Sequence, residues 1–397
     1  MACEEDEDRL SSLTDDILHQ ILSLTPTKDA VKTGVLSKRW YGLWRSCINI
    51  YFTNINLEDE SSILNFNLFL SQIYYVHHFE YILFNRFYID IQYSADPNDI
   101  ISHSIPSLSQ WIKYAAGARV KFLHLLLNYV HGNLHHLNSS PHLPSGVLRC
   151  KTLIVLKLRW FLVKSFPFTD KVDFPELKTL HLEDINFKTH SLFMLFLAGC
   201  PVLEDLKVAN VFFLEEKTDE DDQVSASLNL SNFIRADITN CCFRFPIKTL
   251  FNLEFLRIQL SPQMYTPDDF PTFHKLTHLV INNISDLVLQ MLRHCPKLQN
   301  LQLYQKTQNE SWDNREQGSW VVPKSAPKCL SSYLRSCTIR DFALQDLHQD
   351  IMLARYILNN AGLLQTMTIW SDKEKHEIEI ELSSCPRASA TCQISVS

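Results

Sequence analysis

Residues 177–182 read LKTLHL, and the spacing L-x-x-L-x-L of this stretch recurs along much of the chain. Further clear copies begin at Leu153 (LIVLKL), Leu203 (LEDLKV), Phe233 (FIRADI), Leu253 (LEFLRI), Leu276 (LTHLVI) and Leu298 (LQNLQL). Taken with the copy at Leu177, successive starts are 24, 26, 30, 20, 23 and 22 residues apart. Because alternate side chains of a strand point to the same side, each copy predicts a short strand with one apolar face.

This period has a direct consequence for the fold. A unit of this length cannot bury an apolar face alone, so neighbouring units must stack and share a core. The period resembles that of leucine-rich repeats, which implies a solenoid built on a parallel sheet. Weaker copies at Phe79 (FEYILF) and Val120 (VKFLHL) extend the array toward the N-terminus, and residues 107–117 between them have helical spacing.

Two of the copies share a longer frame. FLAGCPVLEDLKV around Cys200 and MLRHCPKLQNLQL around Cys295 both follow L-x-x-C-P-x-L-x-x-L-x-L, with the cysteines 95 residues apart. Each Cys-Pro is expected to end a helix just before a strand, with its thiol turned into the core. A redox or metal role is the less favoured alternative, because the 11 cysteines include no C-x-x-C spacing.

The N-terminal stretch LSSLTDDILHQILSLTPTKDAVKTGVLSKRWYGLW (10–44) has helical spacing and predicts three short helices. The expected boundaries are a side-chain cap from Thr14 or Asp15, a stop at Pro26, an N-cap at Thr27 before Lys28–Leu36, and an N-cap at Ser37 before Lys38–Trp44. The apolar residues exceed what so small a core can bury. This excess predicts either a partner surface or packing on the next domain.

The same stretch resembles the F-box of the large plant-type F-box family, with matches over 13–22, 26–31 and 36–44. Thr14 and Thr25 depart from the family pattern, which has proline and an apolar residue there. The resemblance implies docking on a Skp-type adaptor and, through it, on the cullin scaffold of a ubiquitin ligase. The residues expected to bind the adaptor are Leu13, Thr14, Ile17, Leu18, Ile21, Leu22, Pro26, Val31, Val35, Leu36, Trp40, Leu43 and Trp44.

The C-terminal text resembles the FBD domain that closes many plant F-box and repeat proteins. The matching segments are WVVPKSAPKCLSSYLRSCTIRDF (320–342), LARYILNNAGLLQTMTIW (353–370) and SSCPRASATCQISV (383–396). This tail is expected to cap the open end of the solenoid. Residues 377–382 alternate Glu with apolar residues, which is strand spacing, whereas the family implies a helix there.

The composition argues against several classes of function. Only 8 glycines are present and neither glycine-rich phosphate loop occurs, which argues against nucleotide enzymes. A net charge of -7 removes the simplest electrostatic case for binding nucleic acid. His77 with His78, and His131 with His135 and His136, lack ligand partners at a recognised spacing. We therefore expect no cofactor, no metal and no catalytic residue.

Two further features concern location and loops. The acidic N-terminus is unlike a signal peptide and no apolar run is long enough to span a bilayer, so a soluble cytoplasmic or nuclear protein without a membrane partner is expected. The acidic run 215–222 is interpreted as a solvated loop, the alternative being a contact for a basic partner.

The sequence thus predicts an α+β chain. The expected parts are an acidic disordered N-terminus (1–8), a three-helix F-box (9–50), a linker with irregular first repeats (51–118), leucine-rich repeats (119–304), a loop (305–327) and an FBD tail (328–397). The function these parts imply is that of a non-catalytic substrate receptor of a cullin-based ligase, whose repeats hold an unidentified target protein. The alternative is a repeat-based binding scaffold with a weakened F-box and no ligase assembly.

Overall fold

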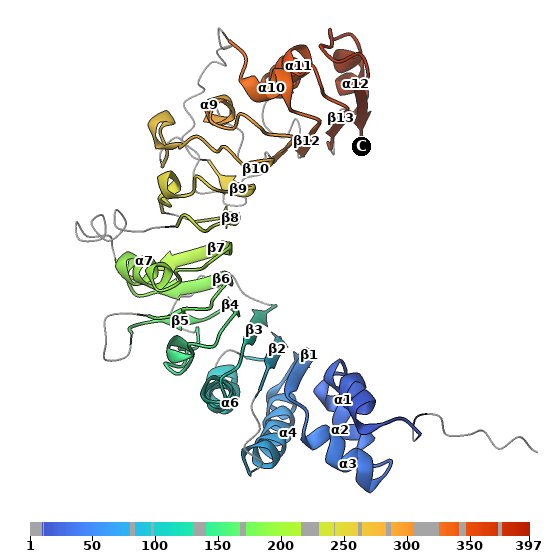
Figure 1. Cartoon of the computed structure of the whole chain (residues 1–397), viewed down its shortest axis with the longest axis vertical. Coiled ribbons are helices and arrows are strands. Elements are labelled where there is room, and N and C mark those ends of the chain that lie inside the picture. Colours follow the sequence, from blue (N-terminus) through green and yellow to red (C-terminus); the bar gives the residue numbers. More distant parts are fainter. Residues whose placement is uncertain are drawn as a thin grey trace, which may run out of the picture. The chain divides into compact units, whose positions relative to one another are not determined.

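The computed structural model (Figure 1) describes residues 10, 12–79, 84–96, 99–130, 140–166, 172–215, 230–241, 243–260, 264–282, 287–304, 325–340, 347–371 and 375–397. The predicted acidic N-terminus, the acidic run beyond Glu215, the loop through residue 324 and the histidines at 131, 135 and 136 lie outside the described residues. The chain divides into two compact units, residues 1–202 with 212–221 and residues 203–211 with 222–397.

Three short helices open the first unit, namely α1 (Asp15–Ser23), α2 (Thr27–Thr33) and α3 (Lys38–Arg45). Ser37 caps α3 as predicted, because its side chain accepts a hydrogen bond from the backbone N–H of Trp40. Two predicted caps are wrong. Thr14 is the N-cap of α1 but makes no side-chain cap hydrogen bond, and Thr27 is the first residue of α2, after an N-cap at Pro26.

The rest of the first unit alternates strands with helices. Its elements are β1 (Asn49–Leu57), α4 (Glu60–Phe79), β2 (Arg86–Tyr93), η1 (Ile100–Ser104), α6 (Ile105–Gly117), β3 (Phe122–Tyr129), η2 (Val147–Arg149), β4 (Val155–Arg159), β5 (Leu162–Val163), β6 (Thr179–Phe187) and α7 (His190–Ala198). The strands pair in parallel in the order β1-β2-β3-β4-β6, and β5 also pairs with β6. Helices α4 and α6 contact each other beside these strands (Figure 1).

The weak repeat predicted at Phe79 (79–84) falls mostly on residues 80–83, which lie outside the described residues. Phe79 is the last residue of α4, and the next described strand is β2, in which Phe87 and Ile89 are buried.

The second unit continues the same alternation. Its elements are β7 (Asp205–Phe213), β8 (Arg235–Thr239), η3 (Ile247–Thr249), β9 (Phe255–Gln259), η4 (Pro267–Asp269), β10 (His278–Asn282), α9 (Leu287–Arg293), β11 (Asn300–Tyr304), α10 (Lys328–Ser332), β12 (Ser336–Arg340), α11 (Leu347–Asn360), β13 (Thr366–Ile369), α12 (Lys375–Ser383) and β14 (Gln393–Val396). The strands from β7 to β14 pair in parallel in sequence order. The C-terminal tail therefore closes this unit by adding three strands of its own.

The tail also settles the open assignment at residues 377–382. They lie in helix α12, as the family resemblance implied. Ile378 and Leu382, which are four residues apart, are fully buried, whereas Ile380 is 55% exposed. The alternation of Glu with apolar residues resembles a strand pattern only because a third apolar residue, Ile380, faces solvent.

The apolar positions of the repeats form the core, as predicted. In strand after strand, alternate residues such as Leu180, Leu182, Leu279 and Leu301 are fully buried. The Cys-Pro pairs follow α7 and α9, and the thiols donate to helix carbonyls, Cys200 to Phe196 at 3.3 Å and Cys295 to Met291 at 3.2 Å. Burial raises the pKa of both thiols, which keeps them protonated and unreactive.

Residues with a left-handed backbone conformation recur with the same period as the repeats. Trp160 (φ 64°) and Asp184 (φ 53°) in the first unit, and Asn210 (φ 53°) and Asn240 (φ 51°) in the second, each lie seven residues after the start of a copy. Asn and Asp tolerate this backbone region, whereas a bulky residue there is an outlier. Trp160 is buried against the rings of Tyr93 and Tyr129, with centroids 6.1 and 6.2 Å away.

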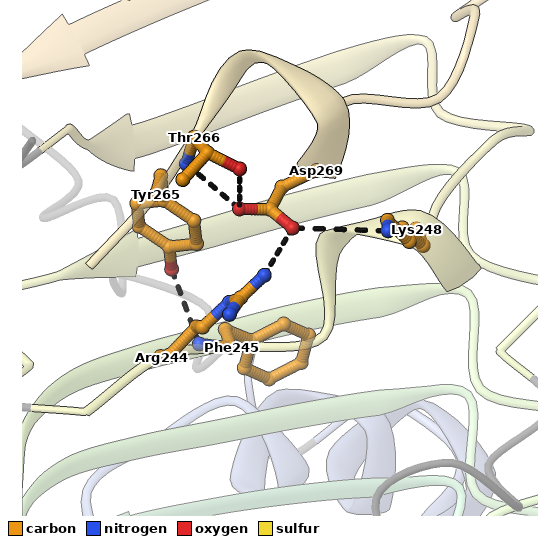
Figure 2. Close-up of polar contacts among 6 residues, drawn as sticks. All are labelled: Arg244, Phe245, Lys248, Tyr265, Thr266 and Asp269. Carbon is orange, nitrogen blue, oxygen red and sulfur yellow. Dashed lines mark hydrogen bonds and ion pairs between the residues drawn. The ribbon is translucent and has the colours of Figure 1, made fainter.

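A polar cluster holds two irregular connections of the second unit together (Figure 2). The carboxylate of Asp269 accepts hydrogen bonds from the backbone N–H and hydroxyl of Thr266, at 2.7 and 2.9 Å, and pairs with Arg244 and Lys248. The hydroxyl of Tyr265 accepts the backbone N–H of Phe245 at 3.1 Å. These contacts connect η4 to the segment around η3, where a regular helix is missing.

We expect Leu180→Ala and Leu279→Ala each to destabilise its unit by about 2 to 5 kcal/mol, because both remove a fully buried leucine side chain from a tightly packed core. Urea unfolding of the variants measures the loss. Gln302→Ala, on the outward side of β11, is the matched control and should change stability by less than about 0.5 kcal/mol. Losses as small as the control's at both leucines would contradict the inward-facing assignment.

The Asp269 cluster should make stability depend on pH. Burial by itself raises the pKa of Asp269, but the hydrogen bonds from Thr266 and the charges of Arg244 and Lys248 outweigh it, so the net pKa is lowered. A lowered pKa stabilises the fold above the ordinary carboxyl pKa, and this contribution is lost as pH falls through the folded-state pKa. Asp269→Asn should therefore lower the melting temperature near pH 7, with a difference from the wild type that shrinks toward pH 3. A difference independent of pH would contradict the role of the charge.

Candidate functional site

The N-terminal helices pack around their own small core. It consists of the buried residues Leu18, Leu22, Ala30, Trp40, Leu43, Trp44 and Cys47, against which Leu13, Val31 and Val76 pack. Five of the thirteen residues predicted to bind an adaptor are therefore interior, namely Leu18, Leu22, Trp40, Leu43 and Trp44. Their side chains hold the three helices in place. Leu13 and Val31 are partly buried at the margin of this core.

The other predicted residues face solvent. They are Thr14, Ile17, Ile21, Pro26, Val35 and Leu36, and we call them the exposed F-box face. Val35 is 89% exposed, Leu36 65% and Ile17 43%, which are large values for apolar side chains in a module that has completed a core. Exposed apolar side chains are a feature of interaction surfaces, which makes these residues the candidate site.

Sequence reasoning missed further exposed residues of this kind, among them Leu10, Leu24 and Tyr41. Leu24, just after α1, is 83% exposed and continues the spacing of Ile17 and Ile21 along the helix. The signal was present in the sequence, because positions i, i+4 and i+7 share one helix face whereas Leu18 and Leu22 lie on another.

Arg39 holds two parts of the exposed F-box face, one near Leu36 and one near Thr14, at the same end of the module. Its Nη2 donates to the carbonyl oxygen of Leu13, and its Nε donates to the carboxylate of Asp15 at 2.8 Å. Arg39 follows Leu36 by three residues, and Leu13 and Asp15 flank Thr14. The turn before α3 is thereby fixed beside the start of α1. Because the side chains of Arg39 and Asp15 are 38% and 62% exposed, this pair orients the helices more than it stabilises them.

The module is also joined to the first strand of the sheet. The hydroxyl of Thr27 accepts the backbone N–H of Tyr51 at 2.8 Å, and the side-chain amide of Asn49 donates to the carbonyl of Ser23 at 3.3 Å. Strand β1 pairs with β2 on its other side, so these contacts occupy part of what would be an open edge. Figure 1 shows α1–α3 beside β1. The N-terminal helices therefore cover the start of the solenoid.

No further chemistry is evident in the part of the chain that the structure describes. It contains no group of three or more His, Cys, Asp or Glu side chains placed to hold a metal ion, and no helix long and apolar enough to cross a membrane. The thiol of Cys47, in the core of the module, has its pKa raised to about 11 by burial, so it is not a reactive nucleophile at neutral pH.

Comparison with known proteins accounts for all three parts of the chain. Residues 10–51 match the F-box domain, residues 108–228 match the repeats described for "FBD-associated F-box protein At5g56370, LRR repeats", and residues 322–369 match the FBD domain. An α-helical F-box followed by parallel strands alternating with helices defines a leucine-rich-repeat protein with an N-terminal F-box.

Relatives from Arabidopsis thaliana share this organisation along their length. The FBD-associated F-box protein At4g10400 is 28% identical over 98% of this chain and 100% of its own, and the F-box/FBD/LRR-repeat protein At4g00160 is 27% identical over 98% and 94%. The chain is therefore similar along nearly its whole length to plant F-box/FBD/LRR-repeat proteins, and it contains matches to all three of their parts. F-box proteins in general act as substrate adaptors of SCF-type ubiquitin ligases, bind Skp-type adaptors and are typically non-catalytic.

Proposed function

We propose that this chain is the substrate-recognition subunit of an SCF-type ubiquitin ligase. The exposed F-box face docks on a Skp-type adaptor, which connects the chain to a cullin, and the repeats bind the protein to be ubiquitinated. The proposal rests on the division of the F-box side chains into a buried group, which forms the core, and an exposed apolar group. The core is complete without Ile17, Ile21, Val35 and Leu36, yet these apolar side chains stay at the surface.

The scaffold alternative gives the exposed F-box face no role. In that case the repeats bind a partner protein and the F-box serves only to cover β1, through Thr27 and Asn49. Covering the strand requires neither Val35 nor Leu36, whose exposure then has no function. The two proposals therefore differ in one measurable property, which is the affinity of the full chain for the adaptor.

Replacing Ile17 or Leu36 by alanine should weaken adaptor binding by about 2 kcal/mol or more, because truncating an apolar anchor in a desolvated interface has a cost of that order. Calorimetric titration of the full chain with a Skp-type adaptor measures the effect. Leu64→Ala, on α4 and 49% exposed in the wild type, is the matched control and should bind normally. Absence of wild-type binding at micromolar concentration would place the scaffold alternative first.

Thr14→Pro should tighten adaptor binding by about 0.5 to 1.5 kcal/mol. The backbone of Thr14 has φ −71° and ψ 156°, angles that a proline ring adopts without strain, and its side chain makes no cap hydrogen bond that the replacement would remove. Proline adds a rigid apolar ring and reduces the entropy of the unfolded chain. The same titration compares the two chains. Equal or weaker binding by the proline variant would show that the threonine makes a favourable contact of its own.

A further inference from the structure

The last strand of the second unit, β14, has an open edge. It pairs in parallel with β13 on one side, and among the described residues no strand pairs with its other side. Figure 1 shows this end of the chain beside β13 and α12. The backbone N–H groups of Gln393 and Ser397 donate to carbonyls on the β13 side, at 2.9 and 2.8 Å. Because backbone groups alternate along a strand, those of Ile394 and Val396 face the open edge.

The inward side of β14 is incompletely covered. The strand register places Ile394 beside Met367 and Val396 beside Ile369. Met367 and Ile369 are fully buried, whereas Ile394 and Val396 are partly exposed. Helix α12 packs against β14, but among the described residues no further repeat stacks on its open side. The apolar core that the repeats share therefore meets solvent at this edge.

The edge also lacks the features that usually prevent strand pairing. Residues 391–397 read TCQISVS and contain no charged residue, no proline and no glycine, and the register between β13 and β14 is regular, without a bulge. Charges, prolines and bulges are the usual protection of an edge strand. In the first unit, by contrast, the side chains of Thr27 and Asn49 join the F-box to the edge strand β1. The edge of β14 is thus suited to pairing with another strand.

The sequence of β14 is self-complementary in one antiparallel register. When Ser395 lies opposite Ser395 of a second copy, Ile394 lies opposite Val396, and Gln393 lies opposite Ser397. Apolar side chains then meet on the inward side of the sheet, and small or uncharged polar side chains meet on the outward side. In this register Ile394 and Val396 form the hydrogen-bonded type of antiparallel pair. Every backbone group that faces the open edge thereby gains a partner.

We propose that this chain forms a dimer with two-fold symmetry through antiparallel pairing of two β14 strands, with Ser395 on the symmetry axis. The self-complementary register favours a second copy over an unrelated extended segment, because the same few residues supply both sides of every contact. A two-fold contact is closed, so assembly ends at the dimer. The inference goes beyond the proposed function and does not depend on adaptor binding.

Sedimentation equilibrium of the full chain tests the proposal. Because two short strands form a small interface, we expect the average mass to rise from monomer toward dimer between about 1 and 100 micromolar. Ser395→Lys should weaken self-association about tenfold, since it places two like charges opposite each other at the axis. Ser395→Asp should do the same. An equimolar mixture of the two variants should associate at least as well as the wild type, because the lysine then faces an aspartate.

The matched control is Thr366→Lys. Thr366 is exposed on the same side of the sheet as Ser395, but it lies on β13, one strand away from the open edge. This variant should associate like the wild type, and all variants should keep the wild-type melting temperature, because the substituted side chains are exposed. A chain that stays monomeric at the highest concentration, an equal loss in Thr366→Lys and Ser395→Lys, or a mixture that does not associate would each overturn the proposal.

Discussion

The structure depends on one constraint, which is that a repeat can bury the inward side of its strand only against its neighbours. Leu180 and Leu182, or Leu301 and Leu303, are fully buried because other strands and helices stack on both sides of them. A stack of this kind has two ends, where the shared core would otherwise meet water. In the first unit the F-box covers the edge of β1, and in the second the tail adds β12–β14 and packs α12 against the last strand.

This constraint gives the F-box two tasks. Its buried side chains and Thr27 serve the fold, whereas Ile17, Val35 and Leu36 have no part in it. The proposed docking function therefore depends on the second group of residues alone. Substitutions at Trp40 or Trp44 would be expected to unfold the module and would say nothing about the interface. The exposed residues are the ones on which the adaptor-binding proposal can be tested.

Parallel stacking also places residues that are distant in sequence in one row. Arg257 and Arg340 are 83 residues apart, yet both guanidinium groups lie close to the ring of Tyr304, at 5.3 and 5.6 Å from its centroid. The Asp269 cluster arises in the same way, because η3 and η4 belong to successive repeats. A repeat fold thus converts side chains at equivalent positions into continuous surfaces.

The sequence alone determined the class of fold and the location of the F-box. Regular spacing of apolar residues is a local signal, and it identified the repeats from Leu153 to Leu298, the helix at 107–117 and the cap at Ser37. Local spacing did not decide the structure where one pattern fits both a strand and a helix, as at residues 377–382. The buried and exposed members of the F-box were decided only by tertiary packing, because Leu18 and Ile17 are both apolar and differ only in which helix face meets α3. The left-handed backbone of Trp160 and the stacking of Arg257 and Arg340 on Tyr304 also depend on tertiary packing, since these contacts join residues from different repeats.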